Sequence, residues 1–184
     1  MTPKTYKLRI VAVFAIVVVG FIGLSSHSHP AFATSIKVSG IYSASLSGSA
    51  EVPNVNTQAT GDAVFKSNAQ AAAAGGAAAA ASSGDKLSYT VDVNDIDQVT
   101  GSHIHMGKSG DNGPIIVTLF DPQTPTGKVN GELTSGTITA HDLSGPMKGK
   151  QLSDLLDLFE QGEAYVNVHT QNHPKGEIRG QIQE

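Results

Sequence analysis

Strict alternation of apolar and polar residues is the feature that most constrains how this chain can fold. Residues 87–93 read Leu-Ser-Tyr-Thr-Val-Asp-Val, so every second side chain is apolar. Successive side chains of a β-strand point to opposite faces, and the pattern therefore predicts a strand with one buried face. Residues 63–65 alternate more briefly. Residues 115–120 are apolar at nearly every position, which predicts a strand covered on both faces.

Further stretches resemble strands, and Gly, Asn, Asp and Pro clusters separate them. These candidate strands are residues 36–46, 132–139, 164–170 and 177–182. One stretch has a different period: Leu152, Leu155, Leu156 and Phe159 are spaced as on one face of a helix, and Gly162 is placed to end it. We therefore expect an all-β fold, a Greek-key-like antiparallel β-sandwich with one short amphipathic helix over one end.

The first 33 residues are typical of a targeting segment. Three basic residues precede an uncharged apolar run at residues 10–24, and Ala31-Phe32-Ala33 provides a small-x-small cleavage pattern. The run is shorter than the roughly 18 to 20 residues of a membrane-spanning helix. Residues 1–33 are thus a signal peptide or an uncleaved N-terminal anchor. Both interpretations predict a protein that is secreted or extracytoplasmic, or tethered to the outer face of a membrane.

Residues 34–184 are a normal length for one domain. They hold nine basic and 16 acidic residues, because three of the 12 basic residues and none of the acidic ones lie in the first 33. This acidic balance argues against nucleic-acid partners and against membrane contact other than through an uncleaved N-terminal segment. The chain has no cysteine, so the domain is stabilised by its core rather than by disulfides, and thiol chemistry is excluded.

An Ala- and Gly-rich stretch at residues 69–84 interrupts the strand pattern. Alanine favours helix, but the central Gly pair breaks it, and short isolated helices are marginal in water. We expect a flexible insert that joins two paired strands and has no function of its own.

Histidines supply the strongest chemical signal. If residues 102–106 are extended, His103 and His105 point to one face, which is a chelating geometry for a metal ion. In residues 164–170, His169 lies on the face opposite two valines, so a neighbouring strand could bring it beside the pair. His173, four residues later in a turn, is either a fourth ligand or a surface residue. Such histidines also occur as purely structural hydrogen-bonding groups, and that alternative stays open.

No catalytic residue can be assigned. Gly107-Lys108-Ser109 lacks the preceding glycine of a phosphate-binding loop, and no Gly-x-Ser-x-Gly elbow is present. The carboxylates are scattered. Glu177 and Arg179 share a strand face, which predicts surface ion pairs. An all-imidazole site would favour copper or zinc over calcium or magnesium.

Several motifs taken together carry a family resemblance. They are residues 46–53 (Leu-Ser-Gly-Ser-Ala-Glu-Val-Pro), 87–91, 103–105 with 112–114, 164–170, and 176–182 (Gly-Glu-Ile-Arg-Gly-Gln-Ile). Over residues 42–183 the chain resembles the CHRD domain, named for chordin and found in many exported prokaryotic proteins. The Ala-rich insert departs from the family, in which a tight turn usually joins those strands.

Three functions are compatible with these observations. The resemblance implies an exported, non-enzymatic module that binds an unknown extracellular protein or surface ligand. The histidines predict instead a copper- or zinc-binding protein that uses His103, His105 and His169. A third hypothesis is a metalloenzyme similar to copper–zinc superoxide dismutase, which would need an open coordination position. The family and the residues favour a non-enzymatic protein.

Overall fold

The computed structural model describes residues 40–67 and 86–184. The predicted N-terminal signal or anchor, residues 1–33, and the Ala-rich insert, residues 69–84, lie outside the described residues. Within the two described ranges, no helix is long and apolar enough to cross a membrane.

Eight strands and one α-helix make up the described chain. In order they are β1 (Ile41–Ser47), β2 (Thr60–Ser67), β3 (Leu87–Ile96), β4 (Val99–Met106), β5 (Ile115–Phe120), β6 (Val129–Ile138), α1 (Leu152–Glu160), β7 (Ala164–Thr170) and β8 (Ile178–Gln181). Three single-turn 3-10 helices are η1 (Gly48–Ala50), η2 (Ala140–Asp142) and η3 (Gly145–Met147).

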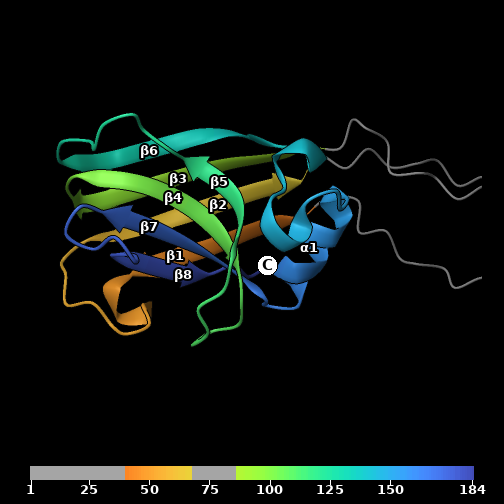
Figure 1. The fold of residues 1–184 in the computed structure, drawn as a ribbon, viewed down its shortest axis with the longest axis horizontal. Helices are drawn as coiled ribbons and strands as arrows, with labels where there is room; N and C mark the ends of the chain where they lie inside the picture. Colours follow the sequence, from red (N-terminus) through yellow and green to blue (C-terminus); the bar gives the residue numbers. More distant parts are fainter. Residues whose placement is uncertain (1–39, 68–85) are drawn as a thin grey trace, which may run out of the picture. The chain divides into compact units, whose positions relative to one another are not determined.

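The strands form a continuous antiparallel sheet that curves back on itself. Their order is β5-β4-β7-β8-β1-β2-β3-β6, so β4 beside β7, β8 beside β1 and β3 beside β6 are pairings of strands that do not follow one another in the chain. Figure 1 shows β4 and β7 passing in front of β2 and β3. The two ends of the sheet meet where the Tyr89 hydroxyl donates to the Leu119 carbonyl at 2.8 Å and Thr134 Oγ1 donates to the same oxygen at 3.3 Å. The predicted antiparallel β-sandwich with one short helix is confirmed.

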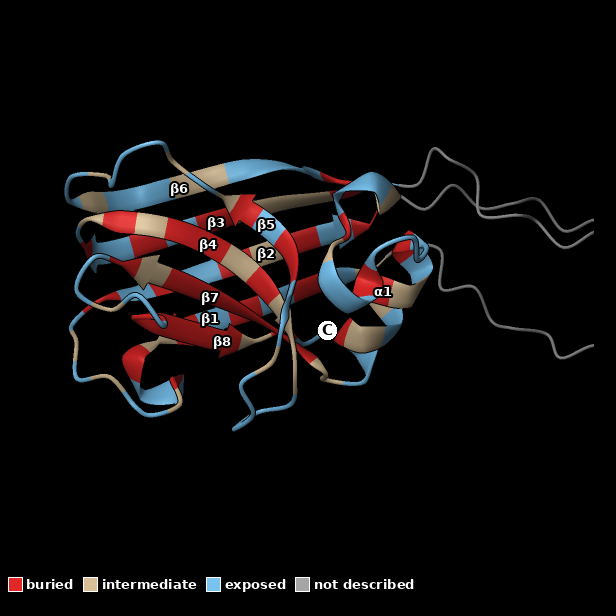
Figure 2. Cartoon of the chain, viewed as in Figure 1, coloured by how far each residue is buried: buried red, intermediate tan, exposed pale blue. Residues whose placement is uncertain are grey.

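Alternation places the core between the two layers. In β1, Tyr42, Ala44 and Leu46 are buried while the residues between them are exposed, and the same banding runs along most strands in Figure 2. In β3, Leu87, Val91 and Val93 are fully buried, as the sequence pattern predicts. One expectation holds only in part: the consecutive residues Ile116 and Val117 of β5 are both fully buried, but other positions of this strand are open to solvent. Its Thr118 is exposed, as is Ile115.

Helix α1 closes one end of the sandwich. It begins after Gln151, whose backbone N–H donates to the Asp154 carboxylate at 2.8 Å, and it ends shortly before Gly162, whose φ of +64° suits glycine. Its Phe159 ring packs edge-on or tilted against Tyr42 and Phe65, at 5.3 Å between centroids in both cases. The predicted apolar face therefore serves packing.

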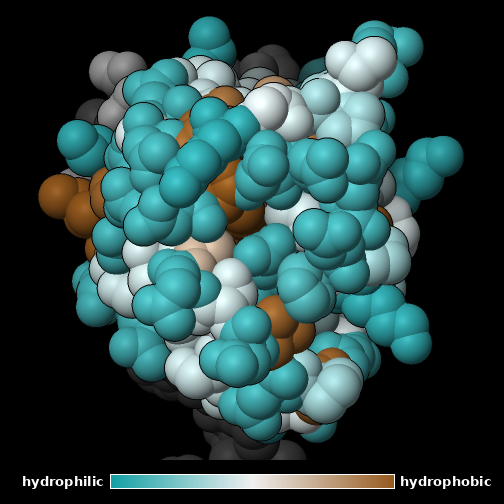
Figure 3. Space-filling view, turned by 90° about the vertical axis from the view of Figure 1, so that its left-hand side faces the viewer, coloured by the Kyte–Doolittle hydropathy of each residue, from teal (hydrophilic) through white to brown (hydrophobic). Residues whose placement is uncertain are grey.

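The end of the sandwich away from α1 is mostly polar. Figure 3 shows it as hydrophilic over most of its area, with small, separate hydrophobic patches. Small separate patches of this kind are normal for a protein surface. This face therefore shows no broad apolar docking surface.

Candidate metal centre

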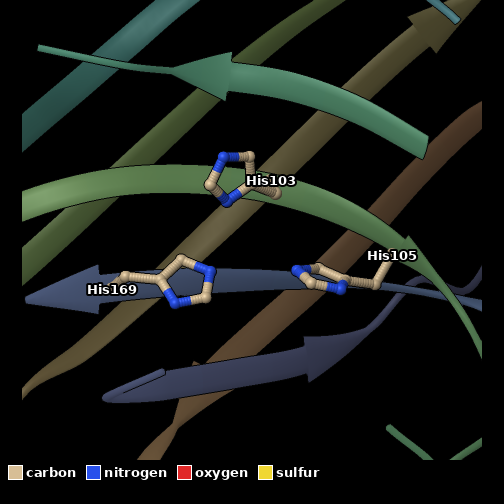
Figure 4. A group of neighbouring side chains, drawn as sticks. All are labelled: His103, His105 and His169. Atoms are coloured by element: carbon tan, nitrogen blue, oxygen red, sulfur yellow. The ribbon is translucent and has the colours of Figure 1, made fainter. Parts of the chain in front are cut away.

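Three histidines meet on the face of β4 and β7 that points away from the core. His103 and His105 alternate in β4 with the core residue Ile104, and His169 extends from the adjacent strand β7. The antiparallel register pairs Gly101 with His169 and His103 with Asn167. Figure 4 shows the three imidazoles gathered in front of the two ribbons. The predicted common face is therefore observed.

The three rings are close enough to share one ion. The centroid distances are 5.0 Å for His103–His169 and 5.9 Å for both His103–His105 and His105–His169. One ligand nitrogen from each residue lies within 4.8 Å of the other two. Nitrogens around a tetrahedral zinc ion at about 2.0 Å are about 3.3 Å apart. Small rotations of the rings would thus complete a metal-binding geometry.

Gly101 makes room for this arrangement. It lies directly opposite His169 and two residues before His103. A Cβ at Gly101 would come within 3.1 Å of His103 Cε1, tighter than ordinary contacts between side chains. The absence of a side chain here lets the His103 ring lie over the strand and approach His169.

Hydrogen bonds select the tautomers of two of the rings. His105 Nδ1 lies 2.8 Å from the Gly113 carbonyl, and His169 Nδ1 lies 3.2 Å from the Pro174 carbonyl. A carbonyl oxygen can only accept, so Nδ1 carries the proton in both rings and Nε2 keeps its lone pair. Second-sphere carbonyls commonly orient metal-binding histidines in this way.

The free nitrogens of the three rings are buried without partners. They are His103 Nδ1, His105 Nε2 and His169 Nε2, half of the six buried side-chain polar atoms that lack a hydrogen bond in the described residues. Most buried polar atoms in proteins are hydrogen-bonded, and each exception calls for an explanation such as an ion. Three such nitrogens converging on one point fit the lone pairs that a transition metal requires.

The electrostatics keep the rings neutral. Burial lowers the pKa of His105, and the charge of Arg179 lowers it further. Burial, then the neighbouring His105, lowers the pKa of His103, and burial with the other two rings lowers the pKa of His169 to about 4. Metal ions compete with protons for these nitrogens, and at neutral pH a metal ion would not have to displace a proton from rings whose pKa is lowered.

His173 is not a member of the three-histidine group. Its backbone instead organises the turn after β7. The N–H donates to Thr170 Oγ1 at 3.1 Å, and the carbonyl accepts from Gly176 N at 3.0 Å. This turn carries Pro174, whose carbonyl bonds His169.

The expectation that Glu177 and Arg179 form surface ion pairs is wrong. Their exposed fractions are only 9% and 2%, because loops cover this part of the sheet. The Glu177 carboxylate accepts hydrogen bonds from Thr57 Oγ1 and Thr170 Oγ1, both at 2.7 Å. It therefore ties the turn that carries Pro174 to the segment before β2.

Sequence reasoning did not assign Tyr165 or Gly113 to the site. Tyr165 pairs with His105 across the two strands, and the two rings stack at 4.9 Å between centroids. Gly113 supplies the carbonyl that fixes the His105 tautomer. A usable signal was present, since Tyr165 lies two and four residues before Asn167 and His169 and so shares their face.

Chemically, this cluster can bind a borderline or soft divalent cation through three neutral imidazoles. Such a set leaves a fourth position on the ion for water or another ligand. Imidazole suits zinc and copper, whereas calcium and magnesium prefer oxygen ligands.

The fold and site define an antiparallel β-sandwich protein with a three-histidine cluster on the face of one layer that points away from the core. A family model for the CHRD domain matches residues 42–182. The chain belongs to the CHRD domain family, as its sequence motifs predicted. Comparisons with curated proteins and with solved structures find no match.

Proposed function

We propose that this chain is an exported CHRD-domain protein that binds one copper or zinc ion through His103, His105 and His169. Its role on this proposal is non-enzymatic: it is an extracytoplasmic binding module whose metal site stabilises the domain or holds the ion for a partner. The partner would be an extracellular protein or a surface ligand.

One observation carries the proposal. Three buried imidazole nitrogens without hydrogen-bond partners converge from two neighbouring strands. A purely structural histidine would be expected to use its second nitrogen in a hydrogen bond, since an unpartnered buried polar atom costs roughly 1 to 3 kcal/mol. A bound ion would satisfy all three nitrogens together.

The choice of metal follows from the ligands. For a set of nitrogen ligands, affinity rises from Zn²⁺ to Cu²⁺ in the divalent series. The chain has no cysteine to provide a thiolate. We therefore expect Cu²⁺ to bind more tightly than Zn²⁺, and Ca²⁺ and Mg²⁺ to bind weakly if at all.

The test is the metal stoichiometry of the full-length protein and of three variants, His103→Gln, His105→Gln and His169→Gln. Dialysis against Zn²⁺ or Cu²⁺ should leave one ion per wild-type chain and much less in each variant. His141→Gln is the matched control, because His141 is an exposed histidine outside the cluster. Sub-stoichiometric metal that does not change with these substitutions would refute the proposal.

A superoxide assay on the loaded protein then separates binding from catalysis. The proposal predicts a turnover no higher than that of the same amount of free ion. Metal-dependent turnover well above that level would favour the enzymatic hypothesis instead.

A further inference from the structure

Arg179 is the largest fully buried side chain of the described residues, although its charge normally favours the surface. Its Nη1 donates to Asn112 Oδ1 at 3.3 Å and its Nη2 donates to the Lys108 carbonyl at 3.0 Å. Its guanidinium carbon lies 3.4 Å from the centroid of the Tyr165 ring. Arg179 is thus held between the 107–114 loop and an aromatic face.

Tyr165 links this arginine to the histidine cluster. Its ring is nearly parallel to that of His105, with an angle of 11° between the planes. Strands β4 and β8 lie on opposite sides of β7, so His105 and Arg179 approach Tyr165 from opposite sides. The three side chains form a column of cation, phenol and imidazole. Such stacking stabilises each pair by about 0.5 to 2 kcal/mol.

The same tyrosine contacts His105 by a second route. The Tyr165 hydroxyl accepts a hydrogen bond from Gly113 N at 3.1 Å, and the Gly113 carbonyl accepts from His105 Nδ1 at 2.8 Å. Only glycine fits at position 113, because a Cβ there would collide with the Met106 carbonyl. Tyr165 therefore fixes the plane of the His105 ring by stacking on it. Through the Gly113 N–H it also positions the carbonyl that selects the His105 tautomer.

Asn112 anchors the loop from its outer side. Its Nδ2 donates to the Val52 carbonyl at 2.8 Å while its Oδ1 accepts from Arg179. The loop that carries Gly113 is consequently tied to residue 52 of the segment after β1 and, through Arg179, to β8. Arg179, Tyr165, Asn112 and Gly113 are not among the three residues that offer a ligand nitrogen, so they reach the site through His105, by orienting its ring and through the charge of Arg179.

We propose that Tyr165 and Arg179 are positioning residues of the metal centre, which set the ring plane and the tautomer of His105 so that its Nε2 faces the shared ion. This inference rests on the proposed metal-binding function. Residues that orient metal-binding histidines typically change metal affinity by 10- to 100-fold when they are replaced.

The decisive variant is Tyr165→Phe. It keeps the ring stack but leaves the Gly113 N–H without its acceptor, so the Gly113 backbone, and with it the carbonyl that bonds His105, is held less firmly. We expect the dissociation constant for Zn²⁺ to rise about 10-fold, near the lower end of the range for such residues. Tyr42→Phe is the control, since it also removes one buried tyrosine hydroxyl, which bonds Glu160 instead. That control should bind Zn²⁺ as the wild type does.

A second readout needs no metal. Long-range ¹H–¹⁵N spectra of the histidine rings report which nitrogen carries the proton. In the metal-free wild type, His105 should show the Nδ1–H tautomer, and Tyr165→Phe should shift it towards Nε2–H. A variant that merely destabilised the fold would lower the unfolding temperature without changing this ratio.

Asn112→Ala tests the same network at an exposed position, where folding should be preserved. It should weaken Zn²⁺ binding a few-fold. Unchanged affinity and an unchanged tautomer in both the Tyr165 and Asn112 variants would overturn the inference while leaving the metal site intact. A wild type that binds no Zn²⁺ would instead overturn the proposed function, and the tautomer of His105 would still test the positioning role.

Discussion

His105 and Tyr165 lie face to face across the β4–β7 pair, with ring centroids 4.9 Å apart and planes 11° from parallel. On the other side of the tyrosine lies the buried guanidinium of Arg179. His105, one ligand of the candidate metal centre, therefore packs between the sheet and the 107–114 loop. The geometry of the site depends on residues from β4, β7, β8 and the loop between β4 and β5.

The space at Gly101 should control the position of His103. In Gly101→Ala, the new methyl group would press on His103 Cε1, so the ring must leave its present position beside His169. We expect Zn²⁺ affinity to fall by about 10-fold, as for other changes that reorient a ligand. Gly127→Ala is the control, because a Cβ there meets nothing within 4 Å. Calorimetric titration of both variants makes the comparison, and equal affinities would show that His103 needs no such space.

The metal-free protein should lose stability in mild acid. The pKa of His169 is lowered to about 4 by burial and by the other two rings, whereas an unfolded histidine titrates near 6.5. Above pH 6.5 the ring is neutral in both states. Between pH 6.5 and 4 only the unfolded chain takes up the proton, so the free energy of unfolding falls as the pH falls.

Between pH 7 and pH 4.5, the free energy of unfolding of His169→Gln should therefore fall by about 1 to 2 kcal/mol less than that of the wild type. Urea unfolding in the presence of a chelator at several pH values measures this difference in the free energy of unfolding. His141→Gln provides the comparison at an exposed position. Identical pH profiles for His169→Gln and the wild type would contradict the prediction.

Glu51 should act in the opposite direction. It is 5% exposed and accepts a hydrogen bond from Asn167 Nδ2 at 2.5 Å. Burial raises its pKa to about 7 despite the nearby charge of Arg179, compared with 4.5 for a free carboxyl. The folded protein therefore retains a proton that the unfolded chain loses between pH 4.5 and 7, and stability falls as the pH rises through this window.

Glu51→Gln, which resembles the protonated acid, should be more stable than the wild type by about 1 to 3 kcal/mol at pH 8, and the advantage should vanish near pH 4.5. Glu132→Gln at an exposed site controls for loss of one charge. Parallel stability curves for Glu51→Gln and the wild type would argue that the Glu51 carboxyl is charged in the folded protein at neutral pH.

Packing of α1 should stabilise the domain independently of the metal centre. Leu155 is fully buried, and Leu155→Ala should cost about 2 to 5 kcal/mol through the cavity that it leaves. Leu158→Ala, in the same helix but only partly buried, should cost less. Chemical unfolding of both variants measures the two losses in the free energy of unfolding. Equal losses would mean that α1 does not close the core as described.

The strands could be predicted because their signal is local. A strand exposes alternate side chains to opposite faces, so the pattern at residues 87–93 identifies both the element and its buried side. The same logic placed His103 and His105 on one face. The exposure of Ile115 and Thr118 in β5 was not predictable in this way, since it depends on which other segments of the chain cover that strand.

The remaining features of the site depend on which distant strands are neighbours. His169 joins the pair only because β4 pairs with β7, and local spacing does not determine such a pairing. The burial of Arg179 and Glu177 was missed for a related reason. Charged residues normally lie at the surface, and these two are covered by loops whose path the sequence pattern does not reveal.

The central claim is that His103, His105 and His169 hold one ion together. X-ray absorption spectroscopy of the zinc-loaded protein measures this directly, because it reports the number, type and distance of the ligand atoms. We expect three imidazole nitrogens at about 2.0 Å and a fourth light-atom ligand, and one imidazole fewer in His105→Gln. A first shell with no more than one imidazole, or the same shell in His105→Gln as in the wild type, would contradict the claim.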